Sequence, residues 1–313
     1  MTIINKNIGI LYGGWSDERI ISLESGKSVY DSLKKNNFNV FLFDFNVDNP
    51  VLLKKFIIQN NIEIIFNLIH GIGGEDGNVQ KYLEDLPVLT IGSDSESSHK
   101  SFNKILTKES WIANNLETPN YLPVNPDIFG NDIKKKLGSK FVLKPVESGS
   151  SVGIKILDTN DFAFNDKDLS YSKLCSLMDN NIEPSNYFLE EYIDSAEFTA
   201  PIISNKVYPI IKIDTKREFY NYEAKYIDND TSFTFPEFPK NIQDNINSVA
   251  LEAFIAVGCS TWGRVDFFMN SNYDISLIEI NSIPGMTSHS LVPMSAKKSG
   301  LSYIDLITLI LKN

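Results

Sequence analysis

The chain has 313 residues, of which 42% are hydrophobic and 22% are charged. These proportions are typical of globular chains and exclude a disordered or fibrous protein. At about 150 residues per domain, the length predicts two domains or three small ones. The net charge of -11 argues against nucleic acid as a partner, because a phosphate-binding surface needs a clustered excess of cations. No run of about 18 apolar residues occurs, so no membrane span is expected.

The cysteines and the N-terminal segment indicate the compartment. Cys175 and Cys259 lie far apart and match no metal-ligand spacing, which argues against a disulfide framework or a zinc site. The start of the chain has no small-residue cleavage site and is typical of a first strand. We therefore expect a cytoplasmic protein.

Four short β-rich runs alternate with segments of helical spacing in the first hundred residues. They lie at 8–12, 40–45, 62–69 and 88–91. This alternation predicts a parallel sheet, whose functional loops follow the carboxyl ends of the strands. Two such loops, GGWSDE and HGIGGEDG, are rich in glycine and carboxylates.

The next segments predict a connection and a small second lobe. A helix is expected over 101–115, and three prolines that follow it mark a crossing between lobes. Strands over 140–146 and 154–157 predict a hairpin around a Ser/Gly loop. The polar stretch 160–181 is predicted to be helical.

From residue 187 the pattern predicts a mainly antiparallel sheet with helices. The elements expected, in chain order, are strands at 187–193, 197–203, 207–213 and 222–226, an aperiodic covering loop at 227–240, a helix at 241–257, strands at 261–269 and 275–280, a turn-rich run through Pro284 and Gly285, and a final helix from Ser302.

The strongest group of candidate site residues is Arg264 and Asp266 on one strand with Glu279 and Asn281 on the next. Alternate residues of a strand face the same side, so all four converge if the strands pair. Two carboxylates and an amide oxygen suit Mg²⁺, which also bridges to phosphates. The alternative is a surface charge ladder on a half-exposed sheet. Bulky apolar neighbours favour a sheet covered on both faces, and therefore the metal site.

Phosphate and nucleotide contacts are predicted in the middle of the chain. The loop around Ser150 and Ser151 offers backbone N–H groups, although it is not a Walker motif. Lys144 lies in an apolar strand and calls for an anion, unless it extends to solvent from an edge strand. Lys104 and Lys225 are weaker candidates. The strand through Glu190 and Glu191 could present main chain to an adenine and Glu197 could accept from a ribose, although surface positions are equally compatible. His70 could be a structural histidine.

Eight segments, read together in chain order, resemble the D-alanine–D-alanine ligase family of the ATP-grasp superfamily. They are GGWSDER, HGIGGEDG, KPVESGSSVG, EFT, YEAKY, WGRVDFF, LIEIN and PGMTSHSLVP. Together they extend over nearly the whole chain, and the second, fifth and last are particular to this family. The resemblance implies a three-lobed α/β and α+β fold: an N-terminal parallel, Rossmann-like lobe (1–100), a small central lobe (101–186) and a mainly antiparallel C-terminal lobe (187–313).

The resemblance also implies a reaction and its site. Two D-alanine molecules are joined through an acyl phosphate, with ATP and two Mg²⁺ ions (or Mn²⁺), for peptidoglycan synthesis. Carried over residue by residue, the implied roles are metal ligands (Asp266, Glu279, Asn281), phosphate contacts (Lys104, Lys144, Lys225, Ser150, Ser151), adenine and ribose contacts (Glu190, Glu191, Ile193, Glu197), first-substrate contacts (Glu18, His70), oxyanion donors (Arg264, Gly285) and a cradle for the second substrate (Ser290, Leu291).

The resemblance also implies that Ser150 and Tyr226 bond with Glu18 so that a covering loop closes over the reactants. A homodimer joined through N-terminal lobes is implied as well. Tyr226 favours the peptide product over a D-lactate ester.

Three other readings remain open. A related carboxylate–amine ligase would use another amino acid or a hydroxy acid. A catalytically silent nucleotide-binding module predicts loss of a metal acid or of Arg264, and all are present. A nicotinamide dehydrogenase would fit the strand–helix alternation, but the first loop is GGWS rather than G-x-G-x-x-G.

Overall fold

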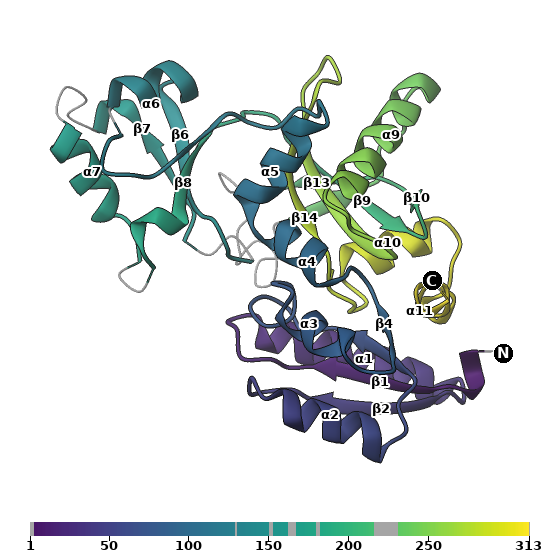
Figure 1. Cartoon of the computed structure of the whole chain (residues 1–313). Coiled ribbons are helices and arrows are strands. Elements are labelled where there is room, and N and C mark those ends of the chain that lie inside the picture. The colour runs from purple at the N-terminus through teal and green to yellow at the C-terminus, as the bar shows by residue number, and fades with distance from the viewer. Residues whose placement is uncertain are drawn as a thin grey trace.

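Three sheets make up this computed structural model, which describes residues 3–128, 130–149, 153–161, 167–179, 182–215 and 231–312. Their strand orders are β2-β1-β3-β4, β5-β8-β6-β7 and β12-β11-β9-β13-β14, with β10 paired to β9 (Figure 1). The expected α/β and α+β fold class is thereby confirmed. Within the described residues, no helix has the length and apolar character needed to cross a membrane.

The N-terminal sheet is parallel throughout, as the strand–helix alternation predicts. Its strands and helices are 3-10 helix η1 (Ile3–Asn5), β1 (Asn7–Tyr12), α1 (Arg19–Lys35), β2 (Asn39–Asp44), α2 (Pro50–Gln59), β3 (Ile64–Asn67), α3 (Asn78–Glu84) and β4 (Leu89–Ile91). Crossover helices cover both faces, so the central strands are apolar on both sides. Ile10 and Leu11, adjacent on β1, are both fully buried.

The prediction of a single helix over 101–115 is wrong. The structure has two helices, α4 (Ser95–Phe102) and α5 (Lys104–Ala113), which meet at Asn103. Asn103 has extended backbone angles, and its side-chain oxygen accepts from the N–H of Leu106 at 3.1 Å. Asparagine is a preferred N-cap residue. The break therefore has a local cause that apolar periodicity does not reveal.

The central sheet is antiparallel and contains the predicted hairpin. Its elements are β5 (Tyr121–Pro123), α6 (Gly130–Leu137), β6 (Lys140–Pro145), β7 (Lys155–Asp158), η2 (Thr159–Asp161), α7 (Lys167–Cys175), η3 (Pro184–Asn186) and β8 (Tyr187–Glu191). β8 was expected to begin the C-terminal series of strands, but it lies between β5 and β6. The division into domains at residues 101 and 187 stays a prediction.

The C-terminal sheet is antiparallel. Its elements are β9 (Ala196–Ile203), β10 (Lys206–Val207), β11 (Ile211–Asp214), β12 (Ser232–Thr234), α9 (Lys240–Ala256), β13 (Trp262–Met269), β14 (Ile275–Asn281), α10 (Leu291–Lys298) and α11 (Tyr303–Leu311). The strand expected over 207–213 is divided into β10 and β11, the aperiodic run contains β12, and α10 follows the turn-rich run. The strand expected at 222–226 lies outside the described residues.

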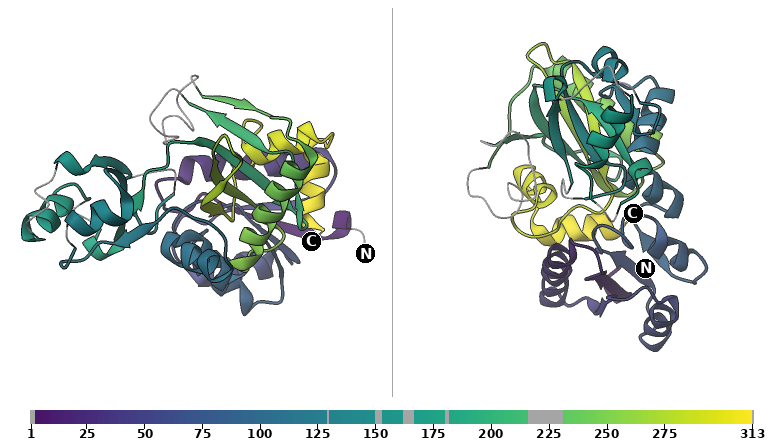
Figure 2. Two further views of the ribbon diagram at one scale, coloured as in Figure 1. Left: turned by 90° about the horizontal axis from the view of Figure 1, so that it is seen from above. Right: turned by 90° about the vertical axis from the view of Figure 1, so that its left-hand side faces the viewer.

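The N-terminal and C-terminal lobes share one hydrophobic core, whereas the central lobe extends away from them (Figure 2). Ile8 and Phe66 of the parallel sheet belong to the same buried cluster as Trp262 of β13 and Ile307 of α11. The central lobe has its own cluster around Phe141 and other residues of its sheet. The molecule therefore consists of one continuous body, formed by the N-terminal and C-terminal lobes, and a central lobe with a core of its own.

Candidate active site

The four polar residues of β13 and β14 lie on one face of the C-terminal sheet. In the antiparallel register Asp266 is opposite Glu279 and Arg264 is opposite Asn281. The register shifts immediately after Asp266, at a β-bulge that includes Ile278. Bulges often occur beside active sites, where they redirect a side chain. The structure thus brings together the residues that the sequence singled out as a metal site.

The carboxylate of Asp266 is buried and held on several sides. Arg264 donates from Nε to Oδ1 at 2.8 Å and from Nη2 to Oδ2 at 2.7 Å. Thr199 Oγ1 donates to Oδ1 at 2.5 Å, and Asn281 Nδ2 donates to Oδ2 at 3.3 Å. Such bidentate and charge-assisted contacts fix the orientation of a carboxylate.

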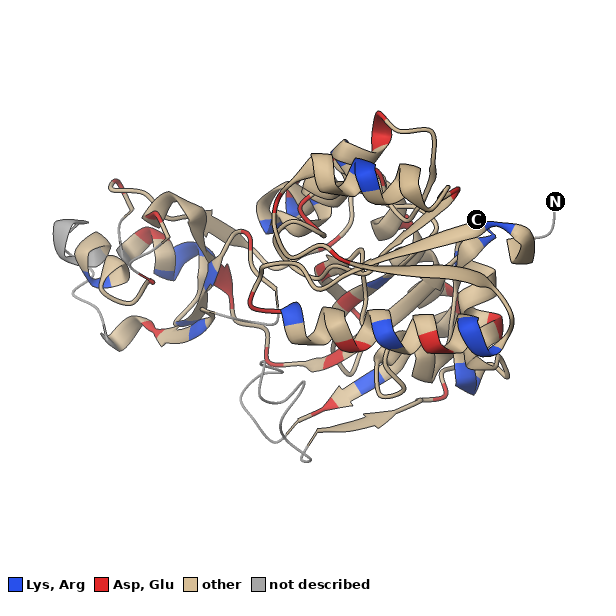
Figure 3. Cartoon of the chain, turned by 90° about the horizontal axis from the view of Figure 1, so that it is seen from below, with Lys and Arg blue, Asp and Glu red and all other residues tan. Residues whose placement is uncertain are grey.

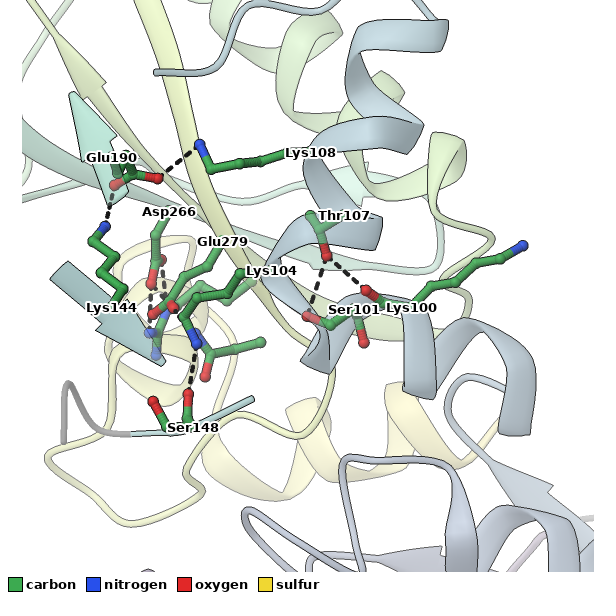
Figure 4. Close-up of polar contacts among 12 residues, drawn as sticks. Lys100, Ser101, Lys104, Thr107, Lys108, Lys144, Ser148, Glu190, Asp266 and Glu279 are labelled. Atoms are coloured by element: carbon green, nitrogen blue, oxygen red, sulfur yellow. Dashed lines mark hydrogen bonds and ion pairs between the residues drawn. The ribbon is translucent and has the colours of Figure 1, made fainter. Parts of the chain in front are cut away.

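Glu279 is more open and faces a cation. Its Oε2 lies 3.8 Å from the Nζ of Lys104, and its side chain is 26% exposed. Lys104 also donates to the carbonyl oxygen of Ser148 at 2.6 Å, so helix α5 contacts the start of the Ser/Gly loop (Figure 4). Oxygen donors of this kind fit Mg²⁺, which uses one or two carboxylates and completes its shell with water and phosphate. Within the part of the chain that the structure describes, no group of three or more His, Cys, Asp or Glu side chains is placed to hold a metal ion.

A cavity of about 340 Å³ lies between the central and C-terminal sheets. Val142, Ile156 and Phe268 give it apolar walls, and Lys104 and Glu279 lie at its polar side. An apolar pocket with a few convergent polar groups is the usual form of a small-molecule site. It contains all the described residues for which nucleotide contacts were predicted: Lys104, Lys144, Glu190, Glu191, Ile193 and Glu197.

Lys144 is partnered differently from the expectation. The sequence called for an anion beside this buried lysine, and the protein itself supplies one, because Lys144 is ion-paired with Glu190. A second lysine, Lys108, lies 2.7 Å from the other oxygen of the same carboxylate. Sequence reasoning did not identify Lys108, which is fully buried.

A second, smaller cavity of about 110 Å³ lies between the loops that follow β1 and β3 and the segment from β14 to α10. Polar groups line much of it, among them Glu18, His70, Arg264 and Asn281. Since Arg264 and Asn281 belong to the paired strands, this cavity adjoins the face that carries Asp266 and Glu279. Its size suits a small polar molecule.

The residues of the C-terminal part match a family model described as "D-ala D-ala ligase C-terminus" over residues 116–312. A D-alanine–D-alanine ligase of Vesicomyosocius okutanii is 39% identical over 97% of this chain and 99% of that protein. One of Saccharophagus degradans is 33% identical over 96% of this chain and 92% of that protein. The chain belongs to the D-alanine–D-alanine ligase family.

Solved structures of the family have the same fold. The ligase of Bacillus anthracis complexed with ATP superposes with a TM-score of 0.80 at 30% identity, over 98% of this chain and 96% of that chain. The VanG D-Ala:D-Ser ligase of Enterococcus faecalis has a TM-score of 0.78 at 22% identity, over 98% of this chain and 99% of that chain. The second likeness supports the fold alone.

His70 has one ring nitrogen available in the smaller cavity of this family member. Its Nδ1 lies 2.8 Å from the carbonyl oxygen of Leu68, which can only accept, so Nδ1 carries the proton. The buried Nε2 has no hydrogen-bond partner among the described residues. Burial lowers the pKa of His70, so Nε2 is an acceptor at neutral pH.

Glu75 is a further buried carboxyl group at this cavity, and sequence reasoning missed it. Burial, with the nearby charge of Glu18, raises its pKa well above the usual range. Its Oε2 accepts from the N–H of Gly71 at 3.2 Å. Glu75 belongs to the HGIGGEDG motif, which could have pointed to it, but a carboxylate among glycines is also typical of an exposed loop.

The Ser/Gly loop approaches Glu18 closely. A Cβ atom on Gly149 would lie 2.0 Å from Glu18 Oε2, so a larger residue at this position would require the Glu18 side chain to move. Ser150 and Ser151 of this loop, and Lys225 and Tyr226 of the expected covering segment, lie outside the described residues.

The residues predicted to hold a second substrate lie where α10 begins. Ser290 is its N-cap, and its Oγ accepts from the N–H of Thr287 at 3.0 Å. Gly285, Ser290 and Leu291 all line the smaller cavity. A helix N-terminus favours an anion such as a carboxylate.

Proposed function

We propose that this chain is an ATP-dependent ligase that joins two D-alanine molecules and releases ADP and phosphate, for peptidoglycan precursor synthesis. One observation carries the proposal: the paired strands β13 and β14 lie between two cavities. Glu279 lines the larger cavity, whereas Arg264 and Asn281 line the smaller one. A phosphoryl group transferred from one cavity to the other would pass these side chains.

In the first step a carboxylate oxygen of one D-alanine attacks the γ-phosphorus of ATP. The bond from that phosphorus to the β-phosphate oxygen breaks, ADP leaves and an acyl phosphate remains. Lys104 and Lys144 offset phosphate charge, and Glu18 with His70 Nε2 receives the substrate ammonium. Asp266, Glu279 and Asn281 would hold Mg²⁺ or Mn²⁺, two ions in the full site, which supplies charge neutralisation for phosphoryl transfer.

In the second step the amine of the other D-alanine attacks the acyl carbonyl carbon. Arg264 and the N–H of Gly285 stabilise the developing oxyanion, because fixed donors in a dry site act most strongly where charge appears. The C–O bond then breaks, phosphate leaves with its electron pair and the amine loses a proton. Ser290 and Leu291 at the start of α10 hold the carboxylate of this second substrate.

Water must be kept from the acyl phosphate between these steps. We assign Ser150 and Tyr226 to a closure that bonds to Glu18, and Ser151 and Lys225 to the phosphates. The close approach of Gly149 to Glu18 supports this assignment, since it brings the loop beside the substrate cavity.

The assembly and location form part of the proposal. A homodimer through N-terminal lobes is supported by apolar side chains exposed on and near α2: Val47, Val51 and Ile58 are 48%, 71% and 63% exposed. Exposed apolar patches are common at interaction surfaces, and this helix is the candidate position for one. We place the protein in the cytoplasm, where ATP is made. On the face seen in Figure 3, the described Lys and Arg residues are interspersed with Asp and Glu, which supports the expectation of no nucleic-acid partner.

Formation of ADP with D-alanine, L-alanine and D-lactate tests the proposed reaction. We expect ADP release that depends on D-alanine, with D-alanyl-D-alanine found by mass spectrometry. L-alanine should give none, and D-lactate as second substrate should give little. Absence of D-alanine-dependent ADP at neutral pH would overturn the proposal.

A further inference from the structure

A chain of three charged side chains, Lys108, Glu190 and Lys144, is linked by two ion pairs (Figure 4). The side chains of Lys108 and Glu190 are 0% and 2% exposed. Two ammonium groups share a single carboxylate, so the chain has an excess of one positive charge. Lys144 is the member that lines the cavity together with Glu190. Among the described residues that line this cavity, Lys104 and Lys144 are the only cations and six are acids. An anion bound there would therefore depend on these two lysines.

This chain of charges connects two lobes. Lys108 lies on α5, whose Trp111 is fully buried in the C-terminal core and donates to the carbonyl oxygen of Ala253 at 3.0 Å. Glu190 and Lys144 lie on β8 and β6, which pair in the central sheet. The Lys108–Glu190 ion pair therefore joins the central sheet to the body of the molecule.

Lys108 is fixed more firmly than Lys144. Its ammonium donates to Thr118 Oγ1 at 2.7 Å and to the carbonyl oxygen of Pro119 at 3.1 Å. Burial raises the pKa of Glu190, but the charges of Lys108 and Lys144 outweigh this effect and hold the pKa below its usual value. Glu190 is consequently an ionised acceptor with one fixed partner, and its other partner reaches the cavity.

We propose that Lys108 is a positioning residue for the nucleotide: it neutralises and orients Glu190, so that Lys144 can leave Glu190 for a phosphate group of ATP. This inference rests on the proposed use of ATP. Without the charge of Lys108, Lys144 would be the remaining cation beside Glu190 among the described residues. A phosphate would then compete with the full negative charge of Glu190 for Lys144. The predicted adenine contact of β8 is through its main chain, whereas the side chain of Glu190 contacts the two lysines. The effect of Lys108 should therefore fall on the phosphates rather than on the base.

Calorimetric titration measures the Kd of ADP with Mg²⁺ and the Kd of adenosine, and the comparison separates an effect on the phosphates from an effect on the base. Lys108→Gln keeps a donor near Thr118 and removes the charge. We expect the Kd for ADP to rise about tenfold, within the usual range of coupling between groups that do not touch directly. The Kd for adenosine should stay within about twofold, because this ligand has no charged group. Glu190→Gln removes the competitor for Lys144 and should raise the preference for ADP over adenosine. Lys100→Gln is the matched control, because Lys100 forms an exposed ion pair with Glu96, and it should change neither constant.

A purely structural role for Lys108 would weaken ADP and adenosine equally, or neither, and that result in Lys108→Gln would overturn the inference. If Lys108→Gln does not fold, Glu190→Gln decides: a higher preference for ADP supports the inference and an unchanged preference overturns it. Wild-type protein that binds neither ligand would overturn the proposed use of ATP together with this inference. Wild-type binding with unchanged preferences in both variants would overturn this inference alone.

Discussion

Glu279 differs from Asp266 in the freedom of its carboxylate. Four hydrogen bonds from Arg264, Thr199 and Asn281 hold Asp266, whereas Glu279 has a cation at 3.8 Å and is 26% exposed on its side chain. A carboxylate with unoccupied acceptor positions is the better candidate to bridge a metal to a phosphate. Glu279 should therefore be more important for turnover than for folding.

We expect Glu279→Gln to reduce kcat by about 100-fold or more, because the loss of a single fixed electrostatic group in an active site commonly has an effect of that size. Its melting temperature should remain close to that of the wild type. Steady-state ADP formation at saturating Mg²⁺ measures the effect. Glu252→Gln, on the exposed side of α9, is the control and should retain full activity. A Glu279→Gln variant with wild-type kcat would remove Glu279 from the metal site.

Glu75 provides a prediction for stability against pH. Its pKa is raised in the folded protein, chiefly by burial, so the folded state keeps a proton that the unfolded state releases above the ordinary pKa of 4.5. The contribution of Glu75 to the free energy of unfolding therefore falls as the pH rises from about 4.5 toward the pKa of the folded protein. Removing the acid should therefore stabilise the protein at higher pH.

Glu75→Gln should raise the free energy of unfolding by more than about 1 kcal/mol at pH 8 and have a much smaller effect at pH 5. Urea unfolding at the two pH values measures this difference. Asp85→Asn, an exposed site after α3, should show no such pH dependence. An equal effect of Glu75→Gln at both pH values would show that Glu75 is not protonated in the folded state.

The helix break at Asn103 illustrates what residue patterns predict at the scale of elements. The sequence predicts strand β1 and the neighbouring strands β13 and β14, because alternating or continuous apolar runs are typical of half-buried or fully buried strands. The break between α4 and α5 could not, since one N-cap asparagine has little effect on apolar periodicity. α10 was missed because it begins within a Ser- and Pro-containing turn, and β8 was placed in the wrong sheet because a strand pattern does not name its partner.

The site residues also divide into those that residue patterns predict and those that they do not. The convergence of Asp266 and Glu279 could be expected from alternation on two neighbouring strands. Lys108 could not be distinguished by sequence, because most helical lysines are exposed and its partner Glu190 is 82 residues away by residue number. Residues in contact only through tertiary packing leave no local pattern.

Asn103→Ala should lower the free energy of unfolding by about 1 kcal/mol through loss of the cap of α5. Because Lys104 is the next residue, the Km for ATP should rise as well. Chemical unfolding and initial rates measure the two effects. Asn114→Ala, at the C-cap of the same helix, is the control. If the two variants had equal stability and equal Km, the break at Asn103 would not position Lys104.

At the scale of the whole molecule, the site depends on how the lobes meet. The N-terminal and C-terminal lobes share a core through Trp262 and Ile307, so the smaller cavity lies on one continuous body. The central lobe contributes Lys144 and Glu190 to the larger cavity, and it contacts the body through Lys108 and Lys104 of α5. A smaller cavity on a continuous body and a larger cavity beside a separate lobe suit the proposed enzyme, which would close over ATP.

The central claim is that β13 and β14 present their oxygens to a metal-bound phosphate between the two cavities. A crystal structure with ADP, Mg²⁺ and D-alanine tests it most directly. We predict Mg²⁺ bound by Asp266, Glu279 and Asn281, with the phosphates of ADP beside Lys104 and Lys144. A nucleotide bound elsewhere, or a metal that contacts none of these three residues, would contradict the account.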